Sequence, residues 1–261
     1  MATETFGIIG AGMLGRAILQ AVLAAGDVAA PPLWVANRSG QLPVPAPQGL
    51  KVVTEAARLA EACDVVLLCV PPAAMEMLAV DLQDKLVISV MAGVTLARIA
   101  ERTGASRIIR AMSSPAAAEG LAYSPWVATA ATSQADRAFA ARLFGACGSS
   151  DQIPDETQLD VFTALTGPVP GFVAYFAELM AAYAEAQGLS PEVSDRAVRQ
   201  LFLGAGRMMA QGAAPPRDHV QEMIDYAGTT AAGLEVLRRS EIGRLLGEGL
   251  DAAVARCRTI G

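Results

Sequence analysis

Charged residues are scarce in this chain of 261 residues, and no stretch of it is strongly basic. Asp, Glu, Lys and Arg make up 18% of the residues, and the formal net charge is −6. The absence of a Lys- or Arg-rich block argues against a surface for nucleic acid. Because 53% of the residues are hydrophobic, intrinsic disorder is excluded, and the length suffices for two ordinary domains or one large one.

Cysteine is also rare, and its spacing disfavours two kinds of stabilisation. The four cysteines lack a CxxC or paired pattern and are scattered along the chain as Cys63, Cys69, Cys147 and Cys257. This spacing predicts neither a metal site nor a disulfide framework, and it fits buried free thiols in a reducing compartment. We therefore expect a cytoplasmic protein without a metal ion.

Long uninterrupted hydrophobic runs are missing as well. No apolar run reaches the roughly 18 residues of a membrane span, and MATETFGIIG at the start lacks the basic region of a signal peptide. We expect no membrane span. The mean hydropathy of +0.38 is nevertheless high for a monomer. It reflects either many alanines or a subunit that buries apolar helices against a partner.

The first half of the chain alternates between short apolar strands and helices. The strand expected at 64–70 is apolar throughout, as a strand covered on both faces should be. This rhythm predicts an α/β Rossmann domain with a doubly wound, mainly parallel sheet over residues 1–152. The expected strands are 5–10, 32–39, 64–70 and 85–93, with further candidates at 106–114 and 121–129, and the expected helices are 13–27 and 54–63.

Beyond about residue 148 the strand rhythm ends, and residues 153–261 are predicted to form an all-helical domain. The expected helices are 156–165, 171–187, 190–212, 229–239 and 241–259. The acidic run 151–160 is interpreted as a solvated linker followed by a helix start. Helix 171–187 is apolar on nearly every side, so we expect it to be buried all round, preferably by an intersubunit contact. Met208 and Met209 are interpreted as core residues.

The stretch GIIGAGMLG places Gly10, Gly12 and Gly15 at the spacing G-x-G-x-x-G, between the first strand and the first helix. In this context Gly10 permits a tight turn, Gly12 lets the backbone approach a pyrophosphate, and Gly15 lets helix and strand pack closely. The helix start then offers free N–H groups to phosphates. A dinucleotide site is favoured over a ligand-free glycine-rich turn.

The end of the second expected strand indicates which dinucleotide is bound. A site that prefers NAD usually has Asp or Glu there, whereas this sequence reads ANRSG. Arg38 is suited to pair with a 2′-phosphate, and Asn37 and Ser39 are suited to add hydrogen bonds. A solvated loop arginine is the alternative. We expect NADPH, with NADH less favoured.

Proton-transferring residues are few. The chain has two lysines, Lys51 and Lys85, and one histidine, His219. Enzymes that oxidise alcohols commonly need His or Lys to accept the hydroxyl proton. We expect His219 in a loop, as a surface or capping residue, although a hydroxyacid dehydrogenase acting through it stays open. Reduction of a cyclic imine, which often arrives already protonated, demands little of the protein beyond positioning the imine against a nicotinamide.

At this point the sequence resembles the pyrroline-5-carboxylate reductase family over nearly its whole length. The resemblance rests on GIIGAGMLGRAI, NRS, DVVLLCVPP, ISVMAGVTL, RIIRAMSSP, DVFTALTG and AGTTAAGLEVL. It implies NAD(P)H-dependent reduction of 1-pyrroline-5-carboxylate to proline by hydride transfer to a C=N bond. It also implies a helical dimerisation domain, and dimers or decamers of dimers whose active site lies between one subunit's nucleotide domain and its partner's helices.

The resemblance also implies roles for individual positions. Residues at the phosphates would be Gly10, Gly12, Met13, Leu14 and Gly15; residues at the adenosine phosphate, Asn37, Arg38 and Ser39; and residues on the nicotinamide side, Val70, Pro71, Met91, Ala92 and Gly93. The implied substrate residues are Thr166, Gly167, Asp225, Gly228, Thr229 and Thr230. Thr230 matches the family threonine near the ring nitrogen and is the candidate catalytic residue; its alternative is a helix N-cap, as for Thr229.

Two loops depart from the family pattern. TGPVPGF at 166–172 replaces a Ser- and Gly-rich sequence, so that Pro168 and Pro170 restrict the backbone. DYAGTT at 225–230 replaces S-P-G-G-T-T, and Asp225 would repel a carboxylate unless it points away or pairs with a cation. VPP and MSSP differ from the family pattern too. A relative that reduces another cyclic imine or ketone, or an NADP-binding regulatory protein without turnover, remains an alternative.

Overall fold

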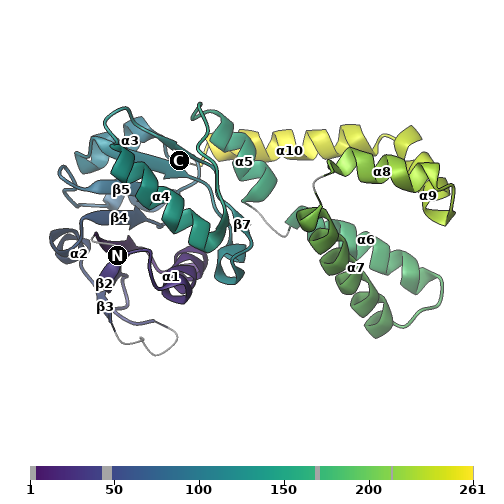
Figure 1. Cartoon of the computed structure of the whole chain (residues 1–261), viewed down its shortest axis with the longest axis horizontal. Helices are drawn as coiled ribbons and strands as arrows, with labels where there is room; N and C mark the ends of the chain where they lie inside the picture. The colour runs from purple at the N-terminus through teal and green to yellow at the C-terminus, as the bar shows by residue number, and fades with distance from the viewer. Residues whose placement is uncertain (1–3, 43–48, 168–170, 213, 261) are drawn as a thin grey trace. The chain divides into compact units, whose positions relative to one another are not determined.

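The computed structural model describes residues 4–42, 49–167, 171–212 and 214–260 of the chain. Its described residues form a seven-stranded sheet in the order β3-β2-β1-β4-β5-β6-β8 (Figure 1). Only β8 runs antiparallel to its neighbour. The strands are β1 (Thr5–Ile9), β2 (Ala30–Ala36), β3 (Leu50–Val53), β4 (Val65–Leu68), β5 (Leu86–Ser89), β6 (Arg107–Ala111) and β8 (Trp126–Ala128).

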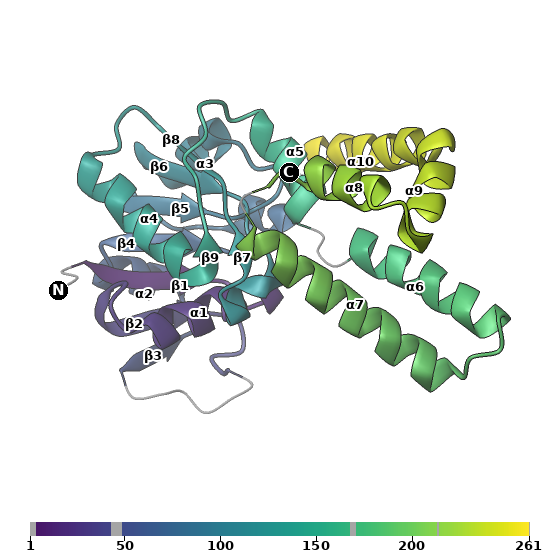
Figure 2. The same cartoon turned by 45° about the vertical axis from the view of Figure 1, so that its right-hand side comes forward.

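Helices cover both faces of this sheet, as expected for strands in which apolar residues predominate. On one face α1 (Met13–Ala25) and α4 (Gln134–Cys147) pack on a core that includes Phe6 and Phe139 (Figure 2). On the other face α2 (Ala56–Ala62) and α3 (Leu96–Thr103) pack on a core that includes Val66. The α/β class and the mainly parallel sheet agree with the prediction.

Several short elements were not predicted from the sequence. These are β3, α3, α4, and the 3₁₀ helices η1 (Pro72–Met77) and η2 (Pro115–Glu119). The strand expected at 121–129 is two strands, because Pro125 has no N–H to continue a ladder. Its first part, β7 (Ala122–Tyr123), pairs with β9 (Gly148–Ser149) in a separate small sheet, and its second part is β8.

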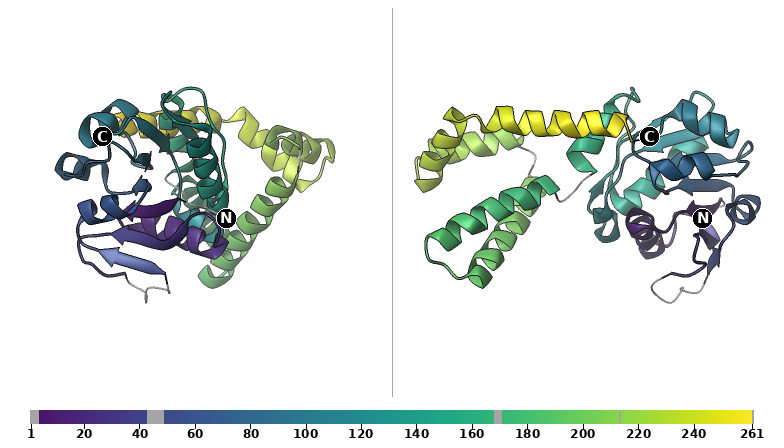
Figure 3. Two further views of the ribbon diagram at one scale, coloured as in Figure 1. Left: turned by 60° about the vertical axis from the view of Figure 1, so that its left-hand side comes forward. Right: turned by 180° about the vertical axis from the view of Figure 1, so that it is seen from behind.

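The rest of the described chain is helical, with α5 (Gln158–Thr166), α6 (Gly171–Ala186), α7 (Pro191–Gln211), α8 (Pro216–Asp225), α9 (Thr229–Arg239) and α10 (Ile242–Arg258). By contacts the chain forms two compact units, residues 1–169 with 251–261, and residues 170–250. Within the second unit α6 pairs with α7, and α8 pairs with α9 (Figure 3). Ser190 caps α7 as predicted, its side chain accepting from the Val193 N–H. The loop expected around His219 was wrong, because His219 lies in α8.

Helix α6 has no buried residue within the single chain, so its predicted complete burial does not occur there. The expectation that Met208 and Met209 are core residues was also wrong for the chain alone, since they are 73% and 50% exposed. Within 158–186, which includes three residues outside the described ones, the chain is long and apolar enough, by length and composition alone, to cross a membrane, and 13% of an 18-residue window in it is buried. The same composition suits helices that pack on another protein surface.

Candidate active site

The loops that follow β1, β2, β4 and β5 meet at one edge of the sheet, because the carboxyl ends of parallel strands lie together. Backbone hydrogen bonds fix these loops. The Gly10 N–H donates to the Ala36 oxygen at 2.9 Å, and the Cys69 N–H donates to the Ile9 oxygen at 2.8 Å. The strand order reverses between β1 and β4, which is where open α/β sheets bind ligands. The structure thus brings all the predicted cofactor residues to one edge.

The three glycines after β1 have different surroundings. Gly10 has a φ of +107°, and a Cβ there would lie 2.3 Å from the Cys69 carbonyl oxygen. A Cβ on Gly15 would lie 2.1 Å from the Gly10 oxygen, so helix and turn approach too closely for any side chain. A Cβ on Gly12 would meet nothing within 4 Å. Packing therefore explains Gly10 and Gly15, whereas open space in front of Gly12 is what a dinucleotide backbone needs.

The start of α1 has the features of an anion-binding site. Gly12 is its N-cap, no side chain caps it, and its first turn contains no acidic residue. The first helical hydrogen bond joins the Arg16 N–H to the Gly12 oxygen at 3.0 Å. The N–H groups of Met13, Leu14 and Gly15 consequently have no helical partner, and they carry the positive end of the helix dipole.

The turn after β2 is shaped by two of its predicted ligand residues. The Asn37 side-chain nitrogen donates to the Gln41 carbonyl oxygen at 2.8 Å, and the Ser39 hydroxyl donates to the Asn37 side-chain oxygen at 3.2 Å. Arg38, between them, is exposed and forms no hydrogen bond or ion pair with the described residues. No acidic residue occurs in 36–41. The turn therefore presents one unpaired guanidinium.

Residues predicted for the nicotinamide side follow β4 and β5. Val70 is half-buried and Pro71 is exposed. Met91 is 2% exposed, and its N–H donates to the Ser89 hydroxyl at 3.3 Å, so Met91 offers backbone rather than side chain to a ligand. Ala92 and Gly93 are half-buried at the same edge.

Thr166 and Gly167 lie at the end of α5 in the same unit as the sheet. The Thr166 hydroxyl donates to the Phe162 carbonyl oxygen at 2.9 Å. A Cβ on Gly167 would come within 2.7 Å of the Thr163 oxygen and 3.2 Å of the Met112 methyl carbon. Pro168 and Pro170 fall outside the described residues.

The remaining predicted substrate residues lie in the second unit, at the turn between α8 and α9. Gly228 is the N-cap of α9 and no side chain caps this helix, so the alternative that Thr229 or Thr230 is the N-cap was wrong. Both threonines are exposed in the first turn. Asp225 accepts a hydrogen bond from the Gln221 side chain at 2.8 Å.

Comparison with known proteins identifies the family in which these features occur together. Residues 156–260 match the family model for pyrroline-5-carboxylate reductase dimerisation, and residues 5–93 match that for NADP oxidoreductase, coenzyme F420-dependent. The pyrroline-5-carboxylate reductase of Haemophilus influenzae is 30% identical over 200 residues, which are 74% of this chain and 74% of the relative. This chain belongs to the pyrroline-5-carboxylate reductase family.

Two further members of the pyrroline-5-carboxylate reductase family match over nearly the whole chain. The enzyme from Vibrio alginolyticus is 29% identical over 264 residues, 98% of this chain and 97% of the relative. The solved structure of a pyrroline carboxylate reductase from Plasmodium falciparum, with NADP bound, has a TM-score of 0.82 and 22% identity, and covers 100% of this chain and 99% of its own. The fold of the chain is therefore that of the family.

In this reductase family member a buried ion pair was missed by sequence reasoning. Arg110 on β6 is 3% exposed, and its guanidinium lies 2.9 Å from the Glu156 carboxylate and 3.4 Å from the Asp160 carboxylate. Asp160 also lies 3.3 Å from Arg258. The interpretation of 151–160 as a solvated linker was wrong in this part. Glu156 and Asp160 lie 46 and 50 positions from Arg110 in the sequence, so no local pattern reveals these contacts.

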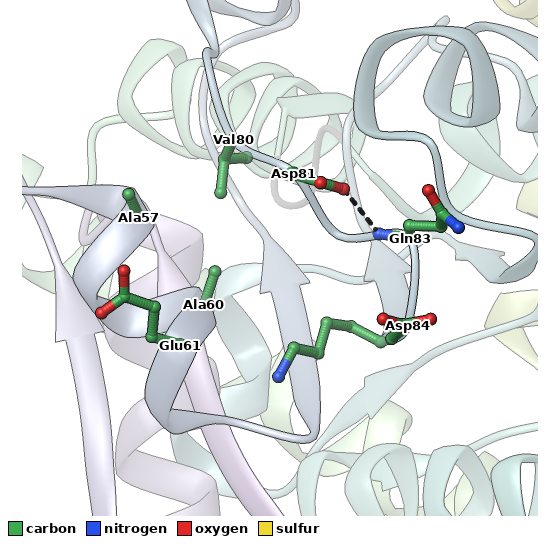
Figure 4. A pocket seen from close by; sticks show the side chains of 8 residues that line it. Ala57, Ala60, Glu61, Val80, Asp81, Gln83 and Asp84 are labelled. Carbon is green, nitrogen blue, oxygen red and sulfur yellow. Dashed lines mark hydrogen bonds between the residues drawn. The ribbon is translucent and has the colours of Figure 1, made fainter.

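Other candidate groups lie apart from this edge. His219 is half-buried, and its Nε2 atom is buried without a partner among the described residues. The described part of the chain contains no group of His, Cys, Asp and Glu that could hold a metal ion. A cavity of about 310 Å3, lined in part by Lys85, lies between α2 and the segment 80–85 that precedes β5, and Figure 4 shows its acidic side chains. It lies at the amino end of β5, away from the glycine loop.

Proposed function

We propose that this chain reduces 1-pyrroline-5-carboxylate to proline with NADPH. The observation that carries the proposal is the space in front of Gly12, combined with an uncapped helix start in a member of the pyrroline-5-carboxylate reductase family. When bound, the reduced nicotinamide supplies a hydride to the carbon of the C=N bond. The residues of the chain bind and orient the reactants, and they exclude competing geometries.

The proposed cofactor residues fall into three groups along the sheet edge. The N–H groups of Met13, Leu14 and Gly15 would hold the pyrophosphate, with Gly10 and Gly12 forming the approach. Arg38 would pair with the 2′-phosphate, because its guanidinium has no other partner among the described residues. Asn37 and Ser39 hold that turn in shape. Backbone atoms of Met91, Ala92 and Gly93, with Val70 and Pro71, would line the nicotinamide side.

The proposed substrate residues would recognise a carboxylate. The start of α9 presents the uncapped N–H groups of Thr229 and Thr230, together with their exposed hydroxyls. Thr230 is the proposed hydrogen-bond donor to the ring nitrogen, while Gly228 provides close backbone approach. Thr166 and Gly167, which belong to the first unit, are proposed substrate residues as well. Asp225 accepts a hydrogen bond from the Gln221 side chain, and the Gln221 side-chain oxygen accepts from Arg238 at 3.2 Å. Gln221 therefore links the Asp225 carboxylate to a cation.

We propose two domains with distinct duties, residues 1–152 for the cofactor and residues 153–261 for association and substrate. The family model matched over 156–260 supports self-association through the second of these. A homodimer is the smallest such assembly, and a decamer built from dimers is a larger one. The four cysteines are free in the described chain, which favours a reducing compartment such as the cytoplasm.

The test is oxidation of NADPH, followed by its absorbance, with freshly prepared 1-pyrroline-5-carboxylate. A parallel trace with NADH measures cofactor preference, and chromatography of the product identifies proline. We expect turnover with NADPH to exceed turnover with NADH. A folded chain that binds NADPH but leaves it unoxidised with 1-pyrroline-5-carboxylate would contradict the proposal, and NADPH left unoxidised by any imine would favour a regulatory protein.

A second function is favoured by the turn at 225–230. Asp225 and Tyr226 are exposed beside the proposed carboxylate site, and Tyr226 is 83% exposed. A carboxylate approaching this turn meets a like charge. Another cyclic imine or a ketone would then be the substrate. Comparing 1-pyrroline with 1-pyrroline-5-carboxylate decides this, because a preference for the compound without the carboxylate would favour the second function.

A further inference from the structure

Arg110 connects two parts of the first unit that the proposed mechanism uses separately. Its guanidinium contacts Glu156 at 2.9 Å through one terminal nitrogen and Asp160 at 3.4 Å through the other. Because the Arg110 side chain is 4% exposed, the planar guanidinium is held between these two carboxylates rather than by solvent. Asp160 lies in α5, the helix that ends at Thr166.

Glu156 extends this contact to the turn after β5. Its Oε1 atom, which accepts from Arg110, also accepts from the Leu96 N–H at 2.7 Å. Leu96 is the first residue of α3 and follows Gly93 by three positions. The turn 91–93 is therefore fixed at both ends, by the Ser89 hydroxyl on the Met91 N–H and by Glu156 on the Leu96 N–H.

Capping of α3 does not explain this arrangement. Thr95 already caps the helix, its hydroxyl accepting from the Arg98 N–H at 3.2 Å. The first N–H of a helix has no partner within the helix and takes one from outside it. Here it is bound by a carboxylate that is itself held by a buried cation. Ala92 and Leu96 also pack on the apolar cluster of Met112, Val127, Ile153 and Leu159, which places the turn in a fixed surface.

We propose that Arg110 and Glu156 are positioning residues, which align the turn 91–93 with the end of α5. This inference rests on the proposed function, in which the turn lines the nicotinamide side and Thr166 and Gly167 contact the substrate. One guanidinium would thereby set both surfaces between which hydride transfer occurs. Small misplacements of reacting groups cost catalysis far more than they cost binding of remote parts of a ligand.

The test compares Glu156→Ala with Glu156→Gln. Alanine removes the acceptor for the Leu96 N–H, whereas glutamine keeps an oxygen at that place. We expect Glu156→Ala to lower kcat about tenfold or more and to raise the primary deuterium isotope effect with NADPH labelled at C4. We expect Glu156→Gln to restore kcat to within about threefold of the parent.

A binding measurement tests the inference without turnover. We expect Glu156→Ala to weaken NADPH several-fold while leaving 2′-phospho-ADP-ribose, which lacks the nicotinamide, unchanged. Asp155→Ala is the matched control, since the neighbouring Asp155 carboxylate is exposed and among the described residues it bonds to Thr157, whose N–H donates to it at 2.8 Å. Leu96→Pro is the second variant. It removes the N–H at a position where helices accept proline, and it should reproduce the Glu156→Ala result even if that variant does not fold.

Equal weakening of NADPH and 2′-phospho-ADP-ribose by Glu156→Ala and Leu96→Pro would overturn the inference, because it would indicate general loosening. Unchanged kcat and unchanged binding in both variants would overturn it as well. If the parent chain fails to oxidise NADPH with 1-pyrroline-5-carboxylate, the proposed function fails, while the comparison of the two ligands still decides the positioning role.

Discussion

The glycines after β1 are needed for different reasons, some for folding and one for binding the ligand. A Cβ on Gly15 would lie only 2.1 Å from the Gly10 oxygen and cannot fit, whereas a Cβ on Gly12 would meet nothing within 4 Å. Both follow from one motif, and the sequence pattern assigns them correctly as a group. Only the coordinates show which glycine is needed for folding.

We expect Gly12→Ala to fold with an unchanged urea midpoint and to weaken NADPH binding about tenfold or more, since its methyl group would occupy ligand space. Gly15→Ala should instead lower the free energy of unfolding by about 2–3 kcal/mol, because the atom it meets is backbone and cannot move aside. Urea titration and NADPH fluorescence measure the two effects. Comparable destabilisation in both variants would contradict the assignment.

Arg38→Ala should raise the KM for NADPH about tenfold and change the KM for NADH little, because an exposed charge-assisted hydrogen bond to the 2′-phosphate is lost. Steady-state kinetics with both cofactors measures this selectivity. Arg142→Ala is the control, since it removes a positive charge from α4, which is far from Arg38 in the sequence. An equal rise for NADPH and NADH would refute the 2′-phosphate contact.

Burial raises the pKa of the Cys63, Cys69 and Cys147 thiols from 9.0 to about 12. At pH 8 their thiolate fraction, and hence their alkylation rate, should be about a thousandfold below that of an ordinary thiol. The rate should rise tenfold for each pH unit. Because the folded pKa exceeds the unfolded one, this contribution to stability is present below pH 9 and is lost as the pH rises towards 12.

Peptide mapping after iodoacetamide treatment measures these rates, and a Cys257→Ser variant removes the fourth thiol from the comparison. Modification of any of the three thiols at the rate of an unfolded peptide would show that the native interior admits solvent there.

At the scale of elements, the predicted strands were confirmed where burial on both faces leaves a continuous apolar run, as in β4. Elements without such a run were missed. Lys51 interrupts the short apolar run of β3, and α8 begins at the second of two prolines that were interpreted as part of a loop. The glycine loop was predictable because its chemistry is local. The Arg110 network was not, because its partners are brought together only by the fold.

Helix α4 begins with a complete capping box. The Ser133 hydroxyl accepts from the Asp136 N–H, and the Asp136 carboxylate accepts from the Ser133 N–H and pairs with Arg107 at 2.9 Å. Ser133→Ala should lower the free energy of unfolding by about 1 kcal/mol. The measurement is a shift of the urea midpoint at constant slope. Gln134→Ala, on the exposed first position of the helix, should leave the midpoint unchanged.

At the scale of the whole molecule, the second unit exposes many large apolar side chains. Val173, Leu179 and Tyr183 on α6 are 48%, 50% and 69% exposed. The family model matched here is one of dimerisation, and a subunit contact accounts for the high mean hydropathy noted at the outset. The sequence predicted burial of α6, but a single chain cannot show the surface that covers it.

We expect light scattering to give a mass that is a multiple of 27.0 kDa. Leu179→Glu should shift the distribution towards the single chain by placing a charge within the apolar face. Glu185→Gln, an exposed polar change near the end of the same helix, is the control. A parent chain of 27.0 kDa at micromolar concentration would contradict this account of α6.

The path of α10 has a consequence for the order in which the protein matures. This helix begins in the second unit and ends in the first, where Arg258 pairs with Asp160 across 98 positions of sequence. During synthesis the sheet and α5 emerge long before Arg258 is made. The first unit can therefore collapse early, but its buried ion-pair network stays incomplete until the helical unit has been translated, so a nascent chain acquires its final rigidity late.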